Sequence, residues 1–133
     1  MVYNCEIEQE GDMFLVRFPD MPNVLTFGDN HEHALEMAKE ALEVCMESDI
    51  SRGMSVPPPA YAGGYPVRVA SHIALSLRLR NLRGERSQTD IASKLGLSYQ
   101  AYQRLENPRK ANPTVKTLEK IARVYGRELS ISL

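Results

Sequence analysis

Four polar side chains share one side of a short helix that the sequence predicts from about Tyr99 to Leu105. They belong to Tyr99, Gln100, Gln103 and Arg104, and residues three or four positions apart are neighbours on a helix surface. A glutamine can form two hydrogen bonds with the edge of an adenine, and an arginine can do so with a guanine. These residue types at this spacing predict a helix that reads base pairs in the DNA major groove.

A preceding helix and a tight turn must position this reading helix. The preceding helix is predicted at about residues 87–95, and Gly96 after it can adopt the positive φ that a tight turn needs. Ser98 offers an oxygen that caps the second helix, and Tyr102 takes an inward position where we expect it to be buried. Two helices joined in this way form a helix-turn-helix. The inward residues of the first helix are Ile91, Ala92 and Leu95.

Phosphate groups of DNA have their own candidate ligands. Gln88 opens the first helix, where its amide and the free backbone N–H groups can bind a phosphate. Arg109, Lys110 and Asn112 lie in the basic loop 107–113 and can do the same, although solubility alone would also explain the two cations. The full set of predicted DNA-binding residues is Gln88, Ser98, Tyr99, Gln100, Gln103, Arg104, Arg109, Lys110 and Asn112.

The array of matching positions resembles the Cro/repressor type of helix-turn-helix domain; the alternative is a small helical bundle without a DNA role. The resemblance implies DNA binding as a dimer over two half-sites. The pair Asn107-Pro108 departs from the pattern, which usually has a small residue or glycine there, and so affects the loop after the reading helix. The matching residues are Ser87-Gln88, Ile91-Ala92, Leu95-Gly96-Leu97-Ser98, Leu105-Glu106-Asn107, Pro113, Thr117-Leu118 and Ile121-Ala122.

Two more helices and a terminal strand complete the C-terminal lobe, residues 71–133. One helix is predicted at about 72–83 with Ser71 as its cap, and the other runs from Thr114, its cap, to Tyr125. Residues 128–133 alternate in polarity and predict a strand, which pairs either with a second copy or with its own domain. The predicted inward residues are Ile73, Leu75, Leu79 and Leu82, then Val115, Leu118, Ile121 and Ala122.

The N-terminal lobe, residues 1–70, reads as a small sheet with one long helix. Asp29 and Glu32 predict a capping box at the helix start. Apolar residues at helical spacing predict a stripe that covers the sheet, whereas five glutamates are expected to face solvent. The elements are strands at about 3–8, 13–18, 24–27 and 65–70, a turn at 9–12, a loop at 19–23, the helix at 30–52 and a connector at about 53–64. The stripe is Ala34, Leu35, Ala38, Ala41, Leu42 and Cys45, and the glutamates are Glu32, Glu36, Glu40, Glu43 and Glu47.

The two halves of the chain carry opposite charges, although the net charge is only −1. Residues 1–60 hold 12 acidic and three basic side chains, a balance of −9, and residues 61–133 hold five acidic and 13 basic, a balance of +8. The basic half fits nucleic acid. The acidic half suits a basic protein or a contact with the chain's own basic half.

The order of the elements in the N-terminal lobe resembles that of HicB-type antitoxins. The resemblance implies an α+β fold with a degraded ribonuclease-H-like lobe, which binds a small basic HicA-type ribonuclease toxin. It also implies that the helix-turn-helix represses the shared operon. The matching residues are Phe18-Pro19-Asp20-Met21-Pro22, Thr26, Gly28-Asp29, Ala34, Ala38-Lys39-Glu40-Ala41-Leu42, Gly53 and Pro57-Pro58-Pro59.

Catalysis by the chain itself is not predicted. A two-metal ribonuclease needs carboxylates that converge in a pocket, whereas Glu6 and Glu8 share an outward strand face. No nucleophile–base pair and no zinc-ligand spacing stands out, so we predict a non-enzyme without metal or cofactor. Cys5 and Cys45 lie in apolar patterns that favour reduced thiols over a disulfide.

The sequence also allows a second interpretation. The chain could be a stand-alone transcriptional regulator whose N-terminal lobe senses a small molecule, with the loop 19–23 and the connector 56–64 framing a pocket. In both interpretations we expect a cytoplasmic protein without a membrane span, because no apolar run approaches ~18 residues. Homodimerisation is expected in both.

Overall fold

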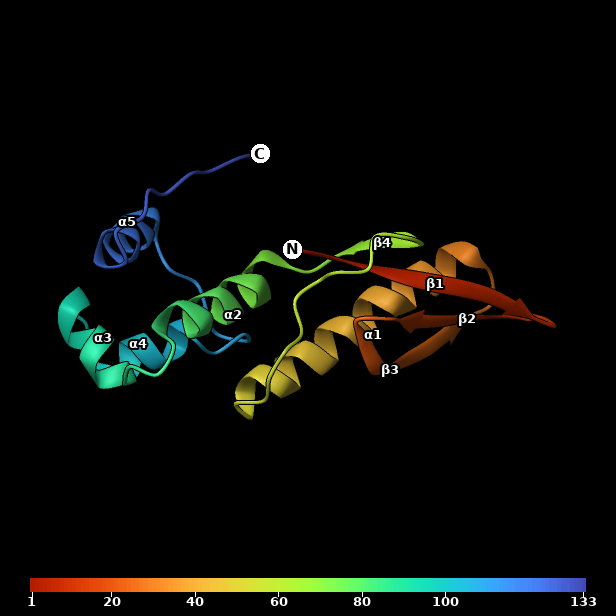
Figure 1. Cartoon of the computed structure of the whole chain (residues 1–133), viewed down its shortest axis with the longest axis horizontal. Coiled ribbons are helices and arrows are strands. Elements are labelled where there is room, and N and C mark those ends of the chain that lie inside the picture. The colour runs from red at the N-terminus through yellow and green to blue at the C-terminus, as the bar shows by residue number, and fades with distance from the viewer. The chain divides into compact units, whose positions relative to one another are not determined.

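The computed structural model describes all 133 residues and has the predicted α+β class (Figure 1). The chain forms two compact units, Met1–Ala74 and Leu75–Leu133, which are described in turn. The first holds an antiparallel sheet with one long helix, and the second is helical. Cys5 and Cys45 are both free thiols, as predicted. None of the helices is long and apolar enough to cross a membrane.

The sheet of the first unit has four antiparallel strands in the order β3-β2-β1-β4. The predicted return of the fourth strand to this sheet is confirmed, because β4 pairs with the start of β1, Val2 opposite Arg68 and Cys5 opposite Tyr65. Helix α1, His31–Ser51, packs along one face of the sheet, mainly against β3 (Figure 1). The strands are β1 Val2–Glu10, β2 Met13–Phe18, β3 Met21–Gly28 and β4 Tyr65–Arg68.

Three predicted strand boundaries in the first unit are wrong, and one of them is the end of β4, which lies at Arg68 and not at residue 70. Strand β1 continues to Glu10, where a turn was expected from residue 9, because Gln9 pairs with Phe14 and Glu10 with Met13. Strand β3 begins at Met21, inside the segment expected to be a loop. Because β3 is an edge strand, the proline within it removes no hydrogen bond that the sheet needs.

Helix α1, His31–Ser51, buries one residue every four along the side that faces the sheet. The predicted capping residue is wrong by one position: the Asn30 side chain, not that of Asp29, accepts a hydrogen bond from His33 N at 2.8 Å. Glu32 is therefore not at the third helical position that a capping box requires. The buried residues are Ala34, Ala38, Leu42, Met46 and Ile50; the other predicted stripe residues, Leu35, Ala41 and Cys45, are half-buried.

One of the five glutamates expected to face solvent has a structural role instead. Glu43 is mostly buried, and its carboxylate accepts hydrogen bonds from Ala70 N at 2.7 Å and from Lys39 Nζ at 3.0 Å. Lys39 also donates to the Arg68 carbonyl at 2.7 Å. These contacts join α1 to the chain just after β4, so Glu43 fixes the end of the first unit.

The connector between α1 and β4 has no regular structure and is held by hydrogen bonds. The Asp20 carboxylate, in the turn before β3, accepts from Ala60 N and Tyr61 N, each at 3.0 Å. The Tyr3 hydroxyl donates to the Pro57 carbonyl at 2.6 Å. The loop and connector that could have framed a ligand pocket are thus bonded to one another.

The second unit is built from four helices around one apolar core. Two details differ from the prediction: Ser71 is the first residue of α2, where the Ala70 carbonyl accepts the first helical bond, and Val115 is exposed rather than inward. Residues 128–133 form no strand in a single chain. The helices are α2 Ser71–Arg83, α3 Gln88–Leu95, α4 Tyr99–Leu105 and α5 Val115–Val124, and the core is Leu79, Ile91, Ala92, Leu95, Tyr102, Leu105 and Ile121.

Candidate nucleic-acid interface

The turn between α3 and α4 has the predicted geometry. Gly96 ends α3 with a φ of 69°, a value that favours glycine. Leu97 N donates to the Ala92 carbonyl at 2.9 Å, and the partly buried Leu97 side chain packs on the core. Ser98 caps α4, since its Oγ accepts from Ala101 N at 3.1 Å. The helix-turn-helix predicted from local signals is therefore confirmed.

Helix α4 separates its buried residues from the four that were predicted to read bases. Tyr102 is buried in the core, as expected. Tyr99, Gln100, Gln103 and Arg104 are all exposed. Gln103 Nε2 donates to the Tyr99 hydroxyl at 2.8 Å, so the amide that would meet a base is already restrained. The structure thus places these four polar residues together on one accessible side of α4.

A buried carboxylate at the C-terminal end of α4 links the helices of the motif. The Glu106 side chain is only 5% exposed. It accepts from Arg83 Nε at 2.7 Å and Arg83 Nη2 at 3.0 Å, from the Tyr102 hydroxyl, and from Gln88 Nε2 at 3.3 Å. Sequence reasoning matched Glu106 to the motif but gave it no role. Tyr102 is four residues away, but Arg83 and Gln88 are 23 and 18 residues away, so no local pattern could reveal these two partners.

The charge of Glu106 is stabilised by these partners. Burial opposes ionisation, but hydrogen bonds from Arg83 and Tyr102 outweigh it and lower the pKa of the Glu106 carboxyl below its ordinary 4.5. Burial, with the adjacent carboxylate, raises the pKa of Tyr102 far above its ordinary 10.0. Tyr102 therefore stays protonated and donates its hydrogen bond at all physiological pH values.

Gln88 is positioned by the same carboxylate. It is the first residue of α3, after Ser87, whose Oγ caps the helix by accepting from Asp90 N at 3.0 Å. One amide hydrogen of Gln88 goes to Glu106, and a primary amide has two. The second hydrogen, together with the free N–H groups of the helix start, can still bind a phosphate.

The loop after α4 is organised by Asn107 and Pro108, the two residues that depart from the Cro/repressor pattern. The Asn107 side-chain oxygen accepts from Arg109 N at 3.0 Å, and its carbonyl accepts from Lys110 N and Ala111 N. Pro108 is buried. Asn107 and Pro108 therefore hold a tight turn that presents Arg109 and Lys110 outward, and Asn112 is exposed as well.

Each of the two units matches a known protein family. A family model described as helix-turn-helix matches residues 77–131, and one described as HicB_like antitoxin of bacterial toxin-antitoxin system matches residues 3–77. The chain belongs to the HicB-like antitoxin family. The family assignment also settles the question of catalysis, because its members are antitoxins and not enzymes.

Individual relatives cover most of the chain. Antitoxin HicB 1 of Photorhabdus laumondii is 32% identical over 127 residues, which are 94% of this chain and 81% of the relative. Antitoxin HicB 2 of the same organism is 34% identical over 107 residues, 79% of this chain and 77% of the relative. Antitoxin HicB of Escherichia coli K12 is 28% identical over 124 residues, 89% of this chain and 88% of the relative. The resemblance drawn from the sequence to HicB-type antitoxins with a helix-turn-helix is thus confirmed.

We predict that Glu106→Gln destabilises the second unit by about 3–5 kcal/mol, because it removes one charge of a buried pair. Hydrogen exchange of the α3 and α4 amides in the full chain measures the loss. Glu119→Gln, an exposed glutamate of α5, is the control and should change the opening free energy by no more than about 0.5 kcal/mol.

The same experiment has a pH signature. A carboxyl whose pKa is lowered by folding contributes stability above its unfolded pKa, and this contribution disappears as pH falls through the folded value. Hydrogen-exchange protection of the wild-type unit should therefore decrease at pH values below 4.5, the ordinary pKa of a glutamate. The Glu106→Gln variant should lack this step. Identical pH profiles for the two proteins would show that the ionised carboxylate does not stabilise the unit.

Proposed function

We propose that this chain is the antitoxin of a type II toxin–antitoxin pair in the cytoplasm. Residues 1–70 bind and neutralise a small basic HicA-like ribonuclease toxin, and residues 71–133 repress the chain's own operon. The observation that carries the proposal is the direct succession, in one chain, of a HicB-like segment and a helix-turn-helix. The charge of the two halves supports it, since −9 suits a basic protein and +8 suits DNA.

In this proposal the first unit is a shortened ribonuclease H fold that binds a partner but has no catalytic site. Glu6 and Glu8 do not converge with other carboxylates; both lie beside Arg17, at 3.5 Å and 3.1 Å. A carboxylate paired with an arginine is poorly available to a divalent ion. The acids of this unit therefore serve recognition of a partner, and the ribonuclease activity belongs to the toxin.

Co-expression tests the toxin half of the proposal. The tagged full chain, produced with the short reading frame beside its gene, should retain that product through purification and prevent the growth arrest that the product causes alone. The matched variant Arg104→Ala, altered only on α4, should rescue growth as well as wild type does. Absence of both a complex and toxicity would overturn the antitoxin assignment.

For the DNA half, we propose that α4 lies in the major groove and that the flanking cations hold phosphates. Tyr99, Gln100, Gln103 and Arg104 would meet base edges, with Ser98 at the helix start beside the backbone. Gln88 and the outward residues Arg109, Lys110 and Asn112 would fix the register on the phosphates. Exposure of all four α4 residues and the restraint of Gln103 by Tyr99 support this division.

Base-reading and phosphate-binding residues should respond differently to mutation. We predict that Gln103→Ala and Arg104→Ala each lose about 1–3 kcal/mol of discrimination between the chain's own promoter fragment and a shuffled fragment. Lys110→Ala should weaken binding to both fragments equally and reduce the salt slope by about 1. Fluorescence anisotropy titrations at several salt concentrations measure both quantities. Equal losses on the two fragments for Gln103→Ala and Arg104→Ala would place them outside base reading.

We further propose that the chain binds DNA as a homodimer or higher oligomer, because α4 has only seven residues and reads few base pairs. The C-terminal tail, residues 128–133, is the proposed pairing strand. Ile131 and Leu133 are exposed in a single chain and Leu129 is half-buried, so pairing with a second tail would remove three apolar side chains from water.

Deletion of residues 128–133 tests the tail. Burial of one aliphatic side chain is worth about 1.5–3 kcal/mol, so we predict that the dimer dissociation constant rises at least ~10-fold. Ile131→Ser should reproduce most of the effect, and Ser130→Ala, on the other side of the predicted strand, should not. Sedimentation equilibrium measures the constants, and an unchanged dimer would exclude the tail from the interface.

A further inference from the structure

Large apolar side chains are exposed on one face of the sheet in the first unit. Tyr3, Cys5, Val16, Phe18 and Val24 point toward the core and are buried, so their neighbours along the strands point the other way. On that other side, Leu25 is 71% exposed and Phe27 52%. An aliphatic and an aromatic side chain in adjacent outward positions of one edge strand form a patch that folding of the unit leaves uncovered.

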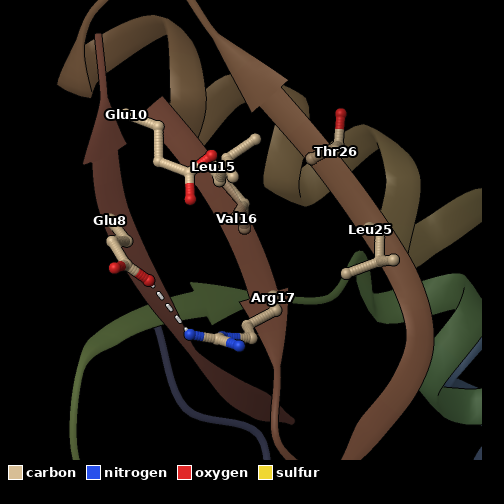
Figure 2. A pocket seen from close by; sticks show the side chains of 7 residues that line it. All are labelled: Glu8, Glu10, Leu15, Val16, Arg17, Leu25 and Thr26. Carbon is tan, nitrogen blue, oxygen red and sulfur yellow. Dashed lines mark hydrogen bonds and ion pairs between the residues drawn. The ribbon is translucent and has the colours of Figure 1, made fainter. Parts of the chain in front are cut away.

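The pairing of the strands places Leu25 and Phe27 on the same face of the sheet as acidic residues of β1. Leu15 lies opposite both Glu8 and Phe27, and Arg17 lies opposite both Glu6 and Leu25. The result is a depression of about 230 Å³ on this side of the sheet, with Glu8 and Glu10 at one edge, Leu25 and Thr26 at the other, and Leu15 between them (Figure 2). It is lined by Glu8 and Glu10 of β1, Leu15, Val16 and Arg17 of β2, and Leu25 and Thr26 of β3.

The charges around the depression are unequal. Arg17 is the one cation among three acids of β1, and it lies 3.1 Å from Glu8 and 3.5 Å from Glu6. Glu10 is exposed, and residues 1–60 carry a net charge of −9. Protein interfaces combine an apolar centre, here Leu15, Leu25 and Phe27, with a polar rim, here Glu8 and Glu10 on the β1 side. The negative sign of this rim selects a positively charged partner.

We propose that this open sheet face is the surface on which the basic toxin docks. The inference rests on the proposed antitoxin function and names the site for it. The toxin would place an apolar side chain beside Leu15, Leu25 and Phe27, and lysine or arginine side chains against Glu8 and Glu10. A second copy of this chain is a poorer occupant, because its own Glu8 and Glu10 would approach those of the first copy.

Two exposed apolar residues of the first unit provide a matched test of the apolar centre. Leu25 lies on the proposed face, and Val44, 62% exposed, lies on α1. Leu25→Asp should weaken binding of the purified toxin to the full chain at least ~10-fold, whereas Val44→Asp should change it less than ~2-fold. Since each change adds a negative charge, which attracts a basic partner, a loss at Leu25 comes from the apolar contact. Phe27→Ser is the second variant in case Leu25→Asp does not fold.

A pair of charge reversals tests the rim. Glu10→Lys on β1 and Glu40→Lys on α1 change the net charge equally, and both glutamates are exposed. Glu10→Lys should slow toxin association and flatten its salt dependence more than Glu40→Lys does, since rim charges act on the association rate. Stopped-flow or biosensor kinetics at two salt concentrations give these rates, and hydrogen exchange of the β1 and β2 amides verifies that the first unit of each variant is folded.

The outcomes separate this inference from the proposed function. If the wild-type chain binds no toxin, the antitoxin assignment fails. If wild type binds but Leu25→Asp and Phe27→Ser bind equally well, or Val44→Asp is the damaging change, the toxin docks elsewhere and the face is wrongly assigned. If Leu25→Asp alters self-association without altering toxin binding, the face is an interface between copies and the proposal is overturned.

Discussion

The buried charge of Glu106 is the constraint on which the geometry of the DNA-binding unit depends. A carboxylate that is almost wholly removed from water is tolerated only where hydrogen bonds and a counter-charge replace the lost hydration. Here Arg83 comes from α2, Gln88 from α3 and Tyr102 from α4 itself. Each helix of the motif must therefore take one position relative to the others for the charge to be satisfied. Apolar packing alone would permit small shifts that this network does not.

The first unit depends on a different feature, the close packing of helix α1 against the sheet. Its buried positions recur every four residues, and the first two are alanines, Ala34 and Ala38. Gly28, at the end of β3, has no Cβ, and one added there would overlap the backbone of Ala34. Small residues thus allow α1 to cover one face of the sheet at short range. Because the unit has a single long helix, that helix covers one face of the sheet and leaves Leu25 and Phe27 on the other face exposed.

The sequence predicted best those features that short segments determine. The bounds of α4 and the caps Ser98 and Thr114 follow from residues within one turn of the helix end, so local patterns sufficed. At the start of α1, Asp29 and Asn30 are adjacent and cap about equally well, so pattern alone could not choose between them.

Other features depended on contacts that are distant in sequence. The start of β3 at Met21 depends on its place at the sheet edge, because only there does a proline cost little. Val24, Leu25 and Phe27 put apolar side chains on both faces of β3, so alternation did not show which face would be exposed. The Glu106 network, whose members were each visible in the sequence, required the tertiary structure to bring them together.

Charge and apolar exposure carry different information in this chain, and the two proposed associations use them differently. DNA binding by the basic unit releases counterions from phosphates, so its affinity falls steeply with salt. Toxin binding on the open face would combine a rim of acids with an apolar centre, and salt screens the rim while leaving burial of Leu25 and Phe27 intact. Raising the salt concentration should therefore release DNA before it releases the toxin. In this proposal the acidic charge of the first unit attracts the toxin, whereas the exposed apolar side chains determine where the toxin is held.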